Sequence, residues 1–387
     1  MKKLDYIDGL KGIGALMVFF CHFVFAFYYA AYSLTEDAVN TASGIEIAIG
    51  KTPLNLIYSG NSAVCLFLVF SGFVLCLSYF GTGDKQRLKT SAWKRYFRLM
   101  PMILISNTLI FALMSLGLYR NGEVAVLTKS TVWFAGFNQF QPDFRQMLGE
   151  SLAGCFLFGT NNYNGVLWTI PYLFSGALVV YLAAYLVGDN PFRYVVYAVM
   201  LLVSLKTDVY FAGIFLGFAA SDFFCTRKKG MELWQRFWLL PLGSFVLGVY
   251  LLSYPSIGSD MGGTIYGVLP PAFTTLYHLA GAALTLAGVL GLPGLKHFFG
   301  ARPFRFLGKV SYSLYLLHFP VIATFSCWLF LSLYGKMSYG FLVGLDFICT
   351  LVLVLVLSAL SERYLEPVSG WLIQKISGLA GRKKELR

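Results

Sequence analysis

The sequence predicts an all-α, polytopic membrane protein built as a bundle of about ten transmembrane helices. Of its 387 residues, 57% are hydrophobic and 12% are charged, whereas a soluble domain carries about 25% charged residues. The mean hydropathy is +0.68, and apolar runs close to the length that spans a bilayer, about 20 residues, recur along the whole chain. No internal repeat or low-complexity segment separates them, so we expect a single integral domain over residues 1–387.

The predicted helices follow ten apolar runs. The first run is too long for the core of a signal peptide, so we expect it to be retained as a helix. The fifth and sixth runs are short, and a break at 206–208 would instead make them one irregular hairpin. In chain order the runs are 10–32, 58–81, 99–119, 166–187, 192–206, 208–225, 237–253, 271–292, 310–334 and 339–361.

The distribution of basic residues supports this division. With ten crossings, all but six of the 30 lysines and arginines fall on one side of the membrane, as the positive-inside rule requires. This asymmetry predicts a multi-pass protein of the cell membrane with both termini in the cytoplasm and a cytoplasmic tail over about residues 366–387. Because the basic residues are spread over short connections, the net charge of +12 indicates topology and no nucleic-acid partner. The six exceptions are Lys51, Arg120, Lys129, Arg145, Lys206 and Lys336.

His22 is the candidate catalytic residue, because it lies deep inside the first run. It follows Lys11 by eleven residues, a rise of about 16 Å along a helix and roughly half of a hydrocarbon core about 30 Å thick. A polar side chain at that depth is costly and tends to face a functional cavity. A neutral imidazole can take a proton from a hydroxyl as a general base. The alternative is a histidine that only hydrogen-bonds a neighbouring helix.

The longest connection on the outer side, about 120–165, combines aromatic and amide side chains. Aromatic rings pack on the C–H faces of a sugar, and amides pair with its hydroxyls, so this connection suits a polyhydroxylated acceptor. The alternative is an interfacial loop whose aromatic residues anchor at the headgroup level. The side chains in question are Trp133, Asn138, Gln139, Gln141, Asn161, Asn162, Tyr163 and Asn164.

The segment YIDGLKGIGALMVFFCH, residues 6–22, resembles the first-helix signature of the acyltransferase-3 family of integral membrane O-acyltransferases. In that signature a basic residue stands eleven positions before an essential histidine. Lys11 occupies the place where the family usually has arginine, and it keeps the charge without the planar fork. The resemblance covers essentially the whole chain. It implies an enzyme that moves an acyl group, in the first place acetyl, from cytoplasmic acyl-CoA to a hydroxyl of a cell-surface or lipid-linked glycan, with His22 as general base.

The connection before the third run carries a second match. In KRYFRLMP, Arg95 and Arg98 correspond to the family's paired arginines, three residues apart and followed by a proline. On a helix this spacing puts both guanidinium groups on one face. The resemblance implies that they bind the phosphates of acyl-CoA, together with Lys11. The alternative is ordinary positive charge at the cytoplasmic end of a helix.

Two further segments supply candidate cavity residues. Ser71 in FLVFSGFVL lies in a segment that resembles the family's second helix, and a packing notch of small residues is the alternative. The segment SYSLYLLHFP, residues 311–320, resembles a late family motif and adds Tyr315 and His318. The alternative for His318 is a hydrogen bond to the carbonyl that Pro320 leaves unpaired.

The fourth long run departs from the family at one position. Trp168 and Tyr172 lie in NGVLWTIPYLFSGALVVY, which resembles the family's Leu–Trp–Ser/Thr–Leu segment. Leu173 stands where members commonly carry a glutamate, so a mechanism that uses that carboxylate is not expected here. Tyr172 is the neighbouring polar candidate.

A proton-coupled transporter or flippase of a small molecule or glycolipid is the alternative function, with His22 and His318 as proton relays. The lack of an inverted repeat argues against it, as does the presence of a single acidic residue, Asp346, deep in a run. A non-catalytic scaffold is a third possibility. The seven cysteines show no metal-ligand spacing, so we expect no metal and no bound cofactor, with acyl-CoA as co-substrate. His278 and His297 match no family motif, and the sequence leaves the acceptor, the acyl length and the oligomeric state open.

Overall fold

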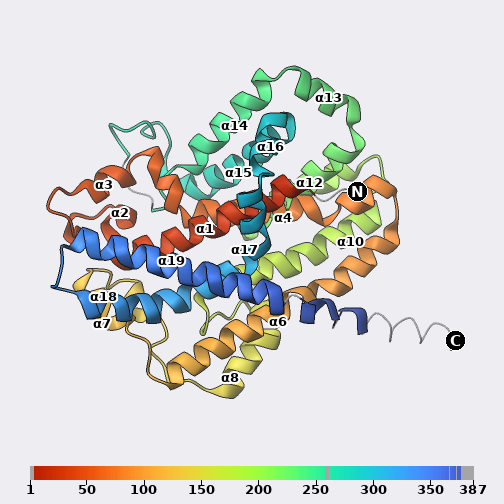
Figure 1. The fold of residues 1–387 in the computed structure, drawn as a ribbon. Coiled ribbons are helices and arrows are strands. Elements are labelled where there is room, and N and C mark those ends of the chain that lie inside the picture. Colours follow the sequence, from red (N-terminus) through yellow and green to blue (C-terminus); the bar gives the residue numbers. More distant parts are fainter. Residues whose placement is uncertain (1–3, 258–260, 366, 372, 376–387) are drawn as a thin grey trace.

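The computed structural model of the protein describes residues 4–257, 261–365, 367–371 and 373–375, and every regular element in these ranges is a helix (Figure 1). The predicted tail lies largely outside the described residues. The first part of the chain forms α1 (Asp5–Phe27), α2 (Tyr29–Ser33), η1 (Glu36–Ala38), α3 (Ile45–Gly50), η2 (Pro53–Tyr58), α4 (Gly60–Leu75), α5 (Leu77–Thr82), α6 (Lys85–Ser115) and α7 (Asn121–Leu127). The middle part forms η3 (Phe134–Gly136), α8 (Phe144–Gly149), η4 (Glu150–Gly154), α9 (Cys155–Leu157), η5 (Gly165–Thr169), η6 (Tyr172–Gly176), α10 (Ala177–Val187), α11 (Arg193–Thr207), α12 (Tyr210–Thr226) and α13 (Lys228–Arg236). The last part forms α14 (Leu239–Leu252), η7 (Pro271–Phe273), α15 (Thr274–Gly291), α16 (Pro293–Phe299), α17 (Arg302–Val321), η8 (Ile322–Ser326), α18 (Cys327–Leu333) and α19 (Tyr339–Tyr364).

Each of the ten predicted runs forms a helix, but not all of these helices are long enough to cross a membrane. In the described chain seven segments are long and apolar enough, or eight if one bent pair counts as a span. The runs that fall short are 192–206, 208–225 and 237–253, where α11, α12 and α14 have 15, 17 and 14 residues. The multi-pass helical architecture is therefore confirmed, whereas the number of ten crossings stays a prediction.

The bent pair consists of α13 and α14, whose axes differ by 85°. The sequence KKGMELWQR of α13 is amphipathic, and none of its residues is buried. A short helix of this kind suits the interface of a bilayer, with its polar face in water and its apolar face against lipid. The chain then turns into α14, which is apolar throughout.

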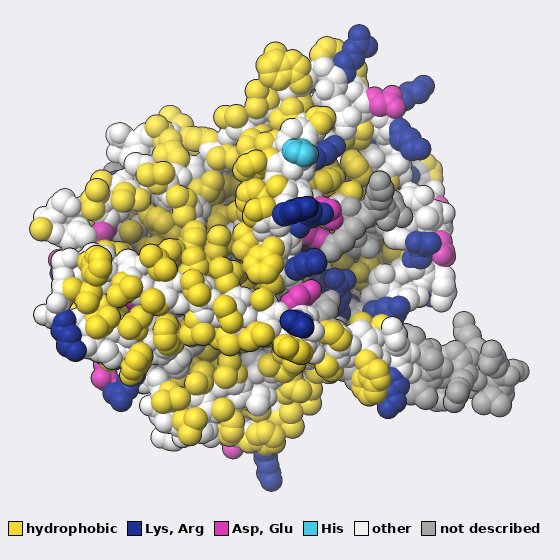
Figure 2. All heavy atoms as spheres, in the orientation of Figure 1, with side chains coloured by type: hydrophobic (Ala, Val, Ile, Leu, Met, Phe, Trp, Pro, Cys, Tyr) yellow, Lys and Arg dark blue, Asp and Glu magenta, His cyan; other side chains and the backbone are white. Residues whose placement is uncertain are grey.

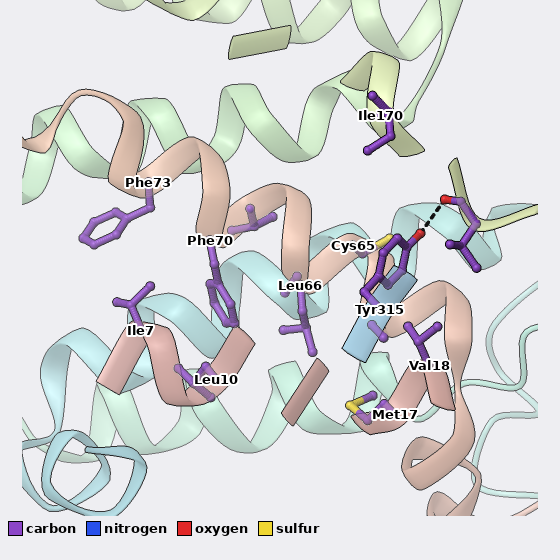
Figure 3. Packing of buried hydrophobic residues seen from close by; sticks show 14 of the residues in the cluster. Ile7, Leu10, Met17, Val18, Cys65, Leu66, Phe70, Phe73, Ile170 and Tyr315 are labelled. Atoms are coloured by element: carbon purple, nitrogen blue, oxygen red, sulfur yellow. Dashed lines mark hydrogen bonds between the residues drawn. The ribbon is translucent and has the colours of Figure 1, made fainter. Parts of the chain in front are cut away.

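Close contacts between α1, α4, α12 and α17 form the centre of the bundle. A Cβ added to Gly12 of α1 would lie 2.5 Å from the backbone nitrogen of Gly308 in α17, and one added to Gly72 of α4 would lie 2.0 Å from the carbonyl of Ile214 in α12. Glycine at these two crossings lets the helix backbones touch. Figure 3 shows the core beside the first contact, where Leu10 of α1 lies near Phe70 of α4.

The face of α19 explains why this bundle is stable in lipid. Its apolar residues are exposed at four-residue spacing, and its polar residues are turned inward, the reverse of a soluble helix. Figure 2 shows the resulting apolar surface; most of the lysines and arginines visible in this view lie toward the side where α1 begins and α19 ends. The exposed residues are Ile348, Val352, Val356 and Leu360, and the buried ones are Asp346, Thr350, Val354 and Ser358.

The parallel arrangement of α1 and α17 constrains the topology. Gly12 meets Gly308, and ten residues further along each helix His22 meets His318, so the two helices run in the same direction for about 15 Å. Two spans of the same direction must be separated by an odd number of crossings. Four long segments lie between α1 and α17, and this even number does not meet the condition. Counting the bent pair as a span gives eight crossings in all, and adding α11 and α12 gives ten; both totals leave an odd number between the two helices and meet the condition. Which side is cytoplasmic stays a prediction.

Candidate functional site

The two histidines that the sequence identified in separate runs form a pair. The Nδ1 atom of His22 lies 2.7 Å from the Nε2 atom of His318, although 296 residues separate them in the chain. The contact follows from the parallel packing of α1 and α17. His318 is completely buried, whereas His22 is partly exposed to a cavity.

The partners of the pair fix the direction of its hydrogen bonds. The Nδ1 atom of His318 lies 3.0 Å from the carbonyl oxygen of Leu314, and a carbonyl only accepts, so this nitrogen carries the hydrogen. In a neutral ring the Nε2 atom of His318 is then an acceptor, and the Nδ1 atom of His22 donates to it. The Nε2 atom of His22 is left with its lone pair, and no partner for it is found among the described residues.

Aromatic rings enclose the His22 imidazole. The Trp133 ring stacks on it with centroids 5.1 Å apart and planes within 5°. The Phe319 ring approaches edge-on at 5.6 Å. The imidazole therefore stands between aromatic rings and is open on the cavity side.

This cavity, which we call the histidine cavity, has a volume of about 470 Å³. It is bounded by α1, α4, η5, α12, α15 and α17 and by the connection between α7 and α8. Besides His22, it receives the predicted residues Trp168 and Tyr315, together with Trp133 and Asn161 from the 120–165 connection. The other polar or aromatic side chains at its wall are Phe25, Tyr32, Asn61, Phe137, Tyr210, Ser256, Thr275 and Phe319.

A second cavity, which we call the basic cavity, has a volume of about 630 Å³. It receives Lys11, Arg95 and Arg98, so the structure brings the three predicted donor-binding residues together, and Ser71 also lies at its wall. Basic side chains outnumber acidic ones there, which favours a polyanionic ligand. Its other charged side chains are Arg87, Lys309, Asp8 and Glu362.

Tyr315 lies at the wall of both cavities. Its hydroxyl donates to the carbonyl of Val166 at 2.8 Å (Figure 3) and is 2.9 Å from the Thr169 hydroxyl. The Phe67 ring meets the Tyr315 ring edge-on at 5.7 Å. The tyrosine is thus held in place at the boundary between the basic cavity and the histidine cavity.

Leu173, at the expected glutamate position, lies at the wall of the basic cavity. Leu173 lies in the π-helical turn η6, and its carbonyl accepts a hydrogen bond of 3.0 Å from the Nε atom of Arg95. A π-turn shifts the hydrogen-bond pattern of a helix and frees backbone groups for such contacts. The backbone therefore holds Arg95 at the wall of the basic cavity.

Two of the predicted cavity residues line neither cavity: His318, which is completely buried and contacts His22, and Tyr172. The Tyr172 hydroxyl donates instead to the carboxylate of Asp208 at 2.7 Å, ahead of α12. The sequence did not single out Asn61 or Tyr210, because no local pattern connects them with His22. Among the described residues no group of three or more histidine, cysteine or acidic side chains could hold a metal ion.

Comparison with known proteins finds acyltransferases. The profile described as "Acyltransferase domain" matches residues 4–363. Acyltransferase clz18 of Cochliobolus lunatus is 23% identical over 98% of this chain and 97% of its own length. Acyltransferase MdmB of Streptomyces mycarofaciens is 25% identical, covering 83% of this chain and 79% of its own length, and O-acetyltransferase PaAT-1 of Phomopsis amygdali is 24% identical, covering 84% and 73%. No solved structure is significantly similar to the chain.

Proposed function

Because this chain belongs to the acyltransferase-3 family of membrane enzymes, we propose that it transfers an acyl group, in the first place acetyl, from cytoplasmic acyl-CoA to a hydroxyl of a cell-surface or lipid-linked glycan. His22 is the general base in this proposal. One observation carries it: a histidine with a free Nε2 lone pair stands in a cavity that meets a basic cavity at Tyr315.

The basic cavity suits the donor. Acyl-CoA carries several phosphates, and guanidinium groups bind phosphate through paired N–H donors. Arg95 and Arg98 supply such groups, and Lys11 adds a third positive charge at the same wall. His22 lies about 16 Å further along α1 from Lys11. The long pantetheine arm would bridge that distance and bring the thioester past Tyr315 toward the base.

The hydrogen-bond direction of the histidine pair suits base catalysis. His22 Nε2 takes the proton of the acceptor hydroxyl while the hydroxyl oxygen forms a bond to the thioester carbonyl carbon. The carbon–sulfur bond then breaks, and the imidazolium proton passes to the leaving thiolate, which gives an ester and free CoA. His318 keeps the Nδ1 hydrogen of His22 in place throughout. General base catalysis of this kind contributes about 10²- to 10⁴-fold to the rate.

The histidine cavity suits a hydroxylated acceptor. Its wall combines indole and phenol rings with the amide groups of Asn61 and Asn161, and rings of this kind pack on the C–H faces of sugars. The relative from Phomopsis amygdali is named an O-acetyltransferase, which supports acetyl transfer to oxygen. The names of the relatives also favour group transfer over transport.

The test is acyl-CoA turnover by the detergent-purified protein. Free CoA is measured with acetyl-CoA as donor while acceptor fractions from cell envelopes are added. We expect acceptor-dependent CoA release that falls about 10²-fold or more in His22→Ala. His22→Asn is a second variant, because its side-chain amide keeps a donor near the position of Nδ1 and lacks only the base.

The matched control is His297→Ala, which removes an exposed histidine on α16. It should turn over like the wild type. Undiminished turnover in a folded His22→Asn protein would show that another group is the base. If the wild type neither binds acetyl-CoA nor releases CoA with any fraction, the proposed reaction is wrong.

A further inference from the structure

A second hydrogen-bonded chain that contains a histidine ends in the histidine cavity. It begins at the carbonyl of Tyr254, which lies 2.8 Å from the Nε2 atom of His278. The Nδ1 atom of His278 lies 2.8 Å from the side-chain nitrogen of Asn61. The side-chain oxygen of Asn61 accepts a hydrogen bond of 2.7 Å from the hydroxyl of Tyr210.

The carbonyl at the start of this chain fixes every donor in it. Because a carbonyl only accepts, the Nε2 atom of His278 carries the hydrogen, and the fully buried ring is neutral since a charge there would be costly. Its Nδ1 atom therefore accepts from the amide of Asn61. The other amide hydrogen of Asn61 points to the hydroxyl of Thr275 at 3.4 Å, so the amide has none left for a ligand. Tyr210 has given its only hydrogen to Asn61. Its oxygen also has the Thr275 hydroxyl as a hydrogen-bonding neighbour, so it can offer a ligand only its remaining lone pair.

The geometry of the bundle puts Tyr210 and His22 at the same cavity. A Cβ on Gly60 of α4 would lie 2.7 Å from the sulfur of Cys21 in α1, so the next residues along, His22 and Asn61, flank one close helix contact. Both of them and Tyr210 line the histidine cavity. The cavity thus presents two directed acceptors, the Nε2 atom of His22 and the hydroxyl oxygen of Tyr210.

Aromatic contacts and a backbone hydrogen bond fix the position of the Tyr210 ring. Trp168 meets it edge-on at 5.1 Å, and Tyr172 lies against it with centroids 5.5 Å apart. Asp208 accepts both the Tyr172 hydroxyl at 2.7 Å and the backbone N–H of Tyr210 at 3.1 Å. Tyr172, which does not reach the cavity, therefore helps to position a residue that does.

The described part of the histidine cavity wall carries no formal charge. Among the described residues that line it, none is Asp, Glu, Lys or Arg. A carboxylate or phosphate on the acceptor would lose its water there without gaining an ionic partner, which is costly. Neutral hydroxyl groups, in contrast, can donate to the two acceptors and pack their ring faces on Trp133 and Trp168.

We propose that the enzyme selects an uncharged acceptor with at least two hydroxyl groups, one that reacts at His22 and a second that donates to the Tyr210 oxygen. This inference rests on the proposed acyl transfer and adds its substrate class. Tyr210 is a specificity-determining residue, and Asn61 and His278 are positioning residues that act through it. The second hydroxyl fixes which hydroxyl of the acceptor meets the base.

The test uses phenyl β-glucoside, its monodeoxy analogues and phenyl β-glucuronide as acceptors, with acetyl-CoA as donor. The analogue that lacks the acylated hydroxyl gives no product. Among the others, we expect one analogue to lower kcat/KM about 2- to 12-fold in the wild type, the range of a neutral hydrogen bond. Tyr210→Phe should lower kcat/KM for the parent glucoside by the same factor. Tyr210→Phe assayed with the sensitive deoxy analogue should show no further loss, because both changes remove the same hydrogen bond. The glucuronide should be a poor acceptor.

Two further variants separate specificity from structure. His278→Leu should raise KM for the parent glucoside and leave KM for acetyl-CoA and for the sensitive deoxy analogue unchanged, whereas a purely structural role would move all three. Tyr277→Phe is the control, because its hydroxyl donates to the carbonyl of Pro270, outside the cavity. If His278→Leu does not fold, Tyr210→Phe still decides the question, since it removes a single oxygen.

The outcomes for the two proposals are distinct. The inference is overturned if the wild type acylates the glucoside but the losses from the deoxy analogue and from Tyr210→Phe multiply when combined. It is also overturned if the glucuronide is used as well as the glucoside. Either result leaves acyl transfer intact. A wild type that releases CoA with the cell-envelope fractions but with none of these glucosides overturns the inference and leaves the proposed function intact. A wild type that releases no CoA with the fractions either overturns both.

Discussion

Replacing His318 tests whether the direction of hydrogen bonding in the histidine pair controls catalysis. His318→Leu keeps a side chain of similar bulk at a completely buried position, so the change in packing is small. It removes the acceptor for the Nδ1 hydrogen of His22. In His318→Gln the side-chain oxygen can stand near the former Nε2 position and accept that hydrogen bond, so the tautomer of His22 is kept.

The size of the effect follows from the contact that is lost. A buried N–H without a partner costs about 1–3 kcal/mol, and the ring can avoid this cost only by moving its hydrogen to Nε2, where it blocks the base. Either way the active form becomes less favourable by about that amount. At roughly 1.36 kcal/mol per tenfold change, His318→Leu should lower kcat/KM about 5- to 150-fold. His318→Gln should retain most of the activity.

The assay is acetyl-CoA turnover by the two variants beside the wild type. Thermal unfolding in detergent is measured first, to show that all three proteins are equally stable. The order of activity should be wild type, then Gln, then Leu. Equal loss in both variants would mean that a histidine is needed for another reason, such as proton transfer through its own ring. Full activity in His318→Leu would refute the assignment of the tautomer.

Three other changes test the remaining parts of the structure. Arg98→Ala should raise KM for acetyl-CoA about 10- to 100-fold, the range of a hydrogen bond to a charged group. Arg305→Ala, which breaks an exposed pair with Asp5, should leave this KM unchanged in the same steady-state assay. Gly72→Ala should destabilise the protein by about 1–3 kcal/mol, because its Cβ would collide with the Ile214 carbonyl. Gly344→Ala, with nothing within 4 Å, should unfold at the same temperature as the wild type or slightly above. Tyr315→Ala should join the two cavities and raise the turnover of octanoyl-CoA relative to acetyl-CoA, measured in competition.

The sequence predicts a site residue where one apolar run is enough to identify it. The depth of His22 in the first run and the late motif around His318 each marked a residue that the structure brings to the site. Equal distances of ten residues from Gly12 to His22 and from Gly308 to His318 make sense only once the two helices are known to pack in parallel. Tertiary packing, which no local pattern encodes, therefore supplied the pair itself.

The same limit explains what the sequence missed. Tyr210 reaches Asn61 across 149 residues, and Asn61 reaches His278 across 217, so the sequence alone favoured only a structural role for His278. Hydropathy likewise marked the run at 237–253 as one span, but it could not show that the chain bends by 85° just before it, between α13 and α14. Apolar composition determines that a helix forms, whereas its length and direction depend on neighbours.

The neutral partner of His22, the proposed base, has a consequence for how the two cavities would work in the proposed reaction. A carboxylate beside His22 would stabilise the imidazolium that forms during the reaction, but His318 offers only a lone pair, and its own hydrogen is tied to the carbonyl of Leu314. In the proposed reaction the proton therefore gains little by staying on His22 and would pass quickly to the leaving sulfur. That transfer requires the thioester sulfur to lie within hydrogen-bond reach of the same Nε2 atom that took the proton. The proposed reaction therefore requires the donor to enter from the basic cavity and to end beside His22, and Tyr315, which lines both cavities, lies on that path.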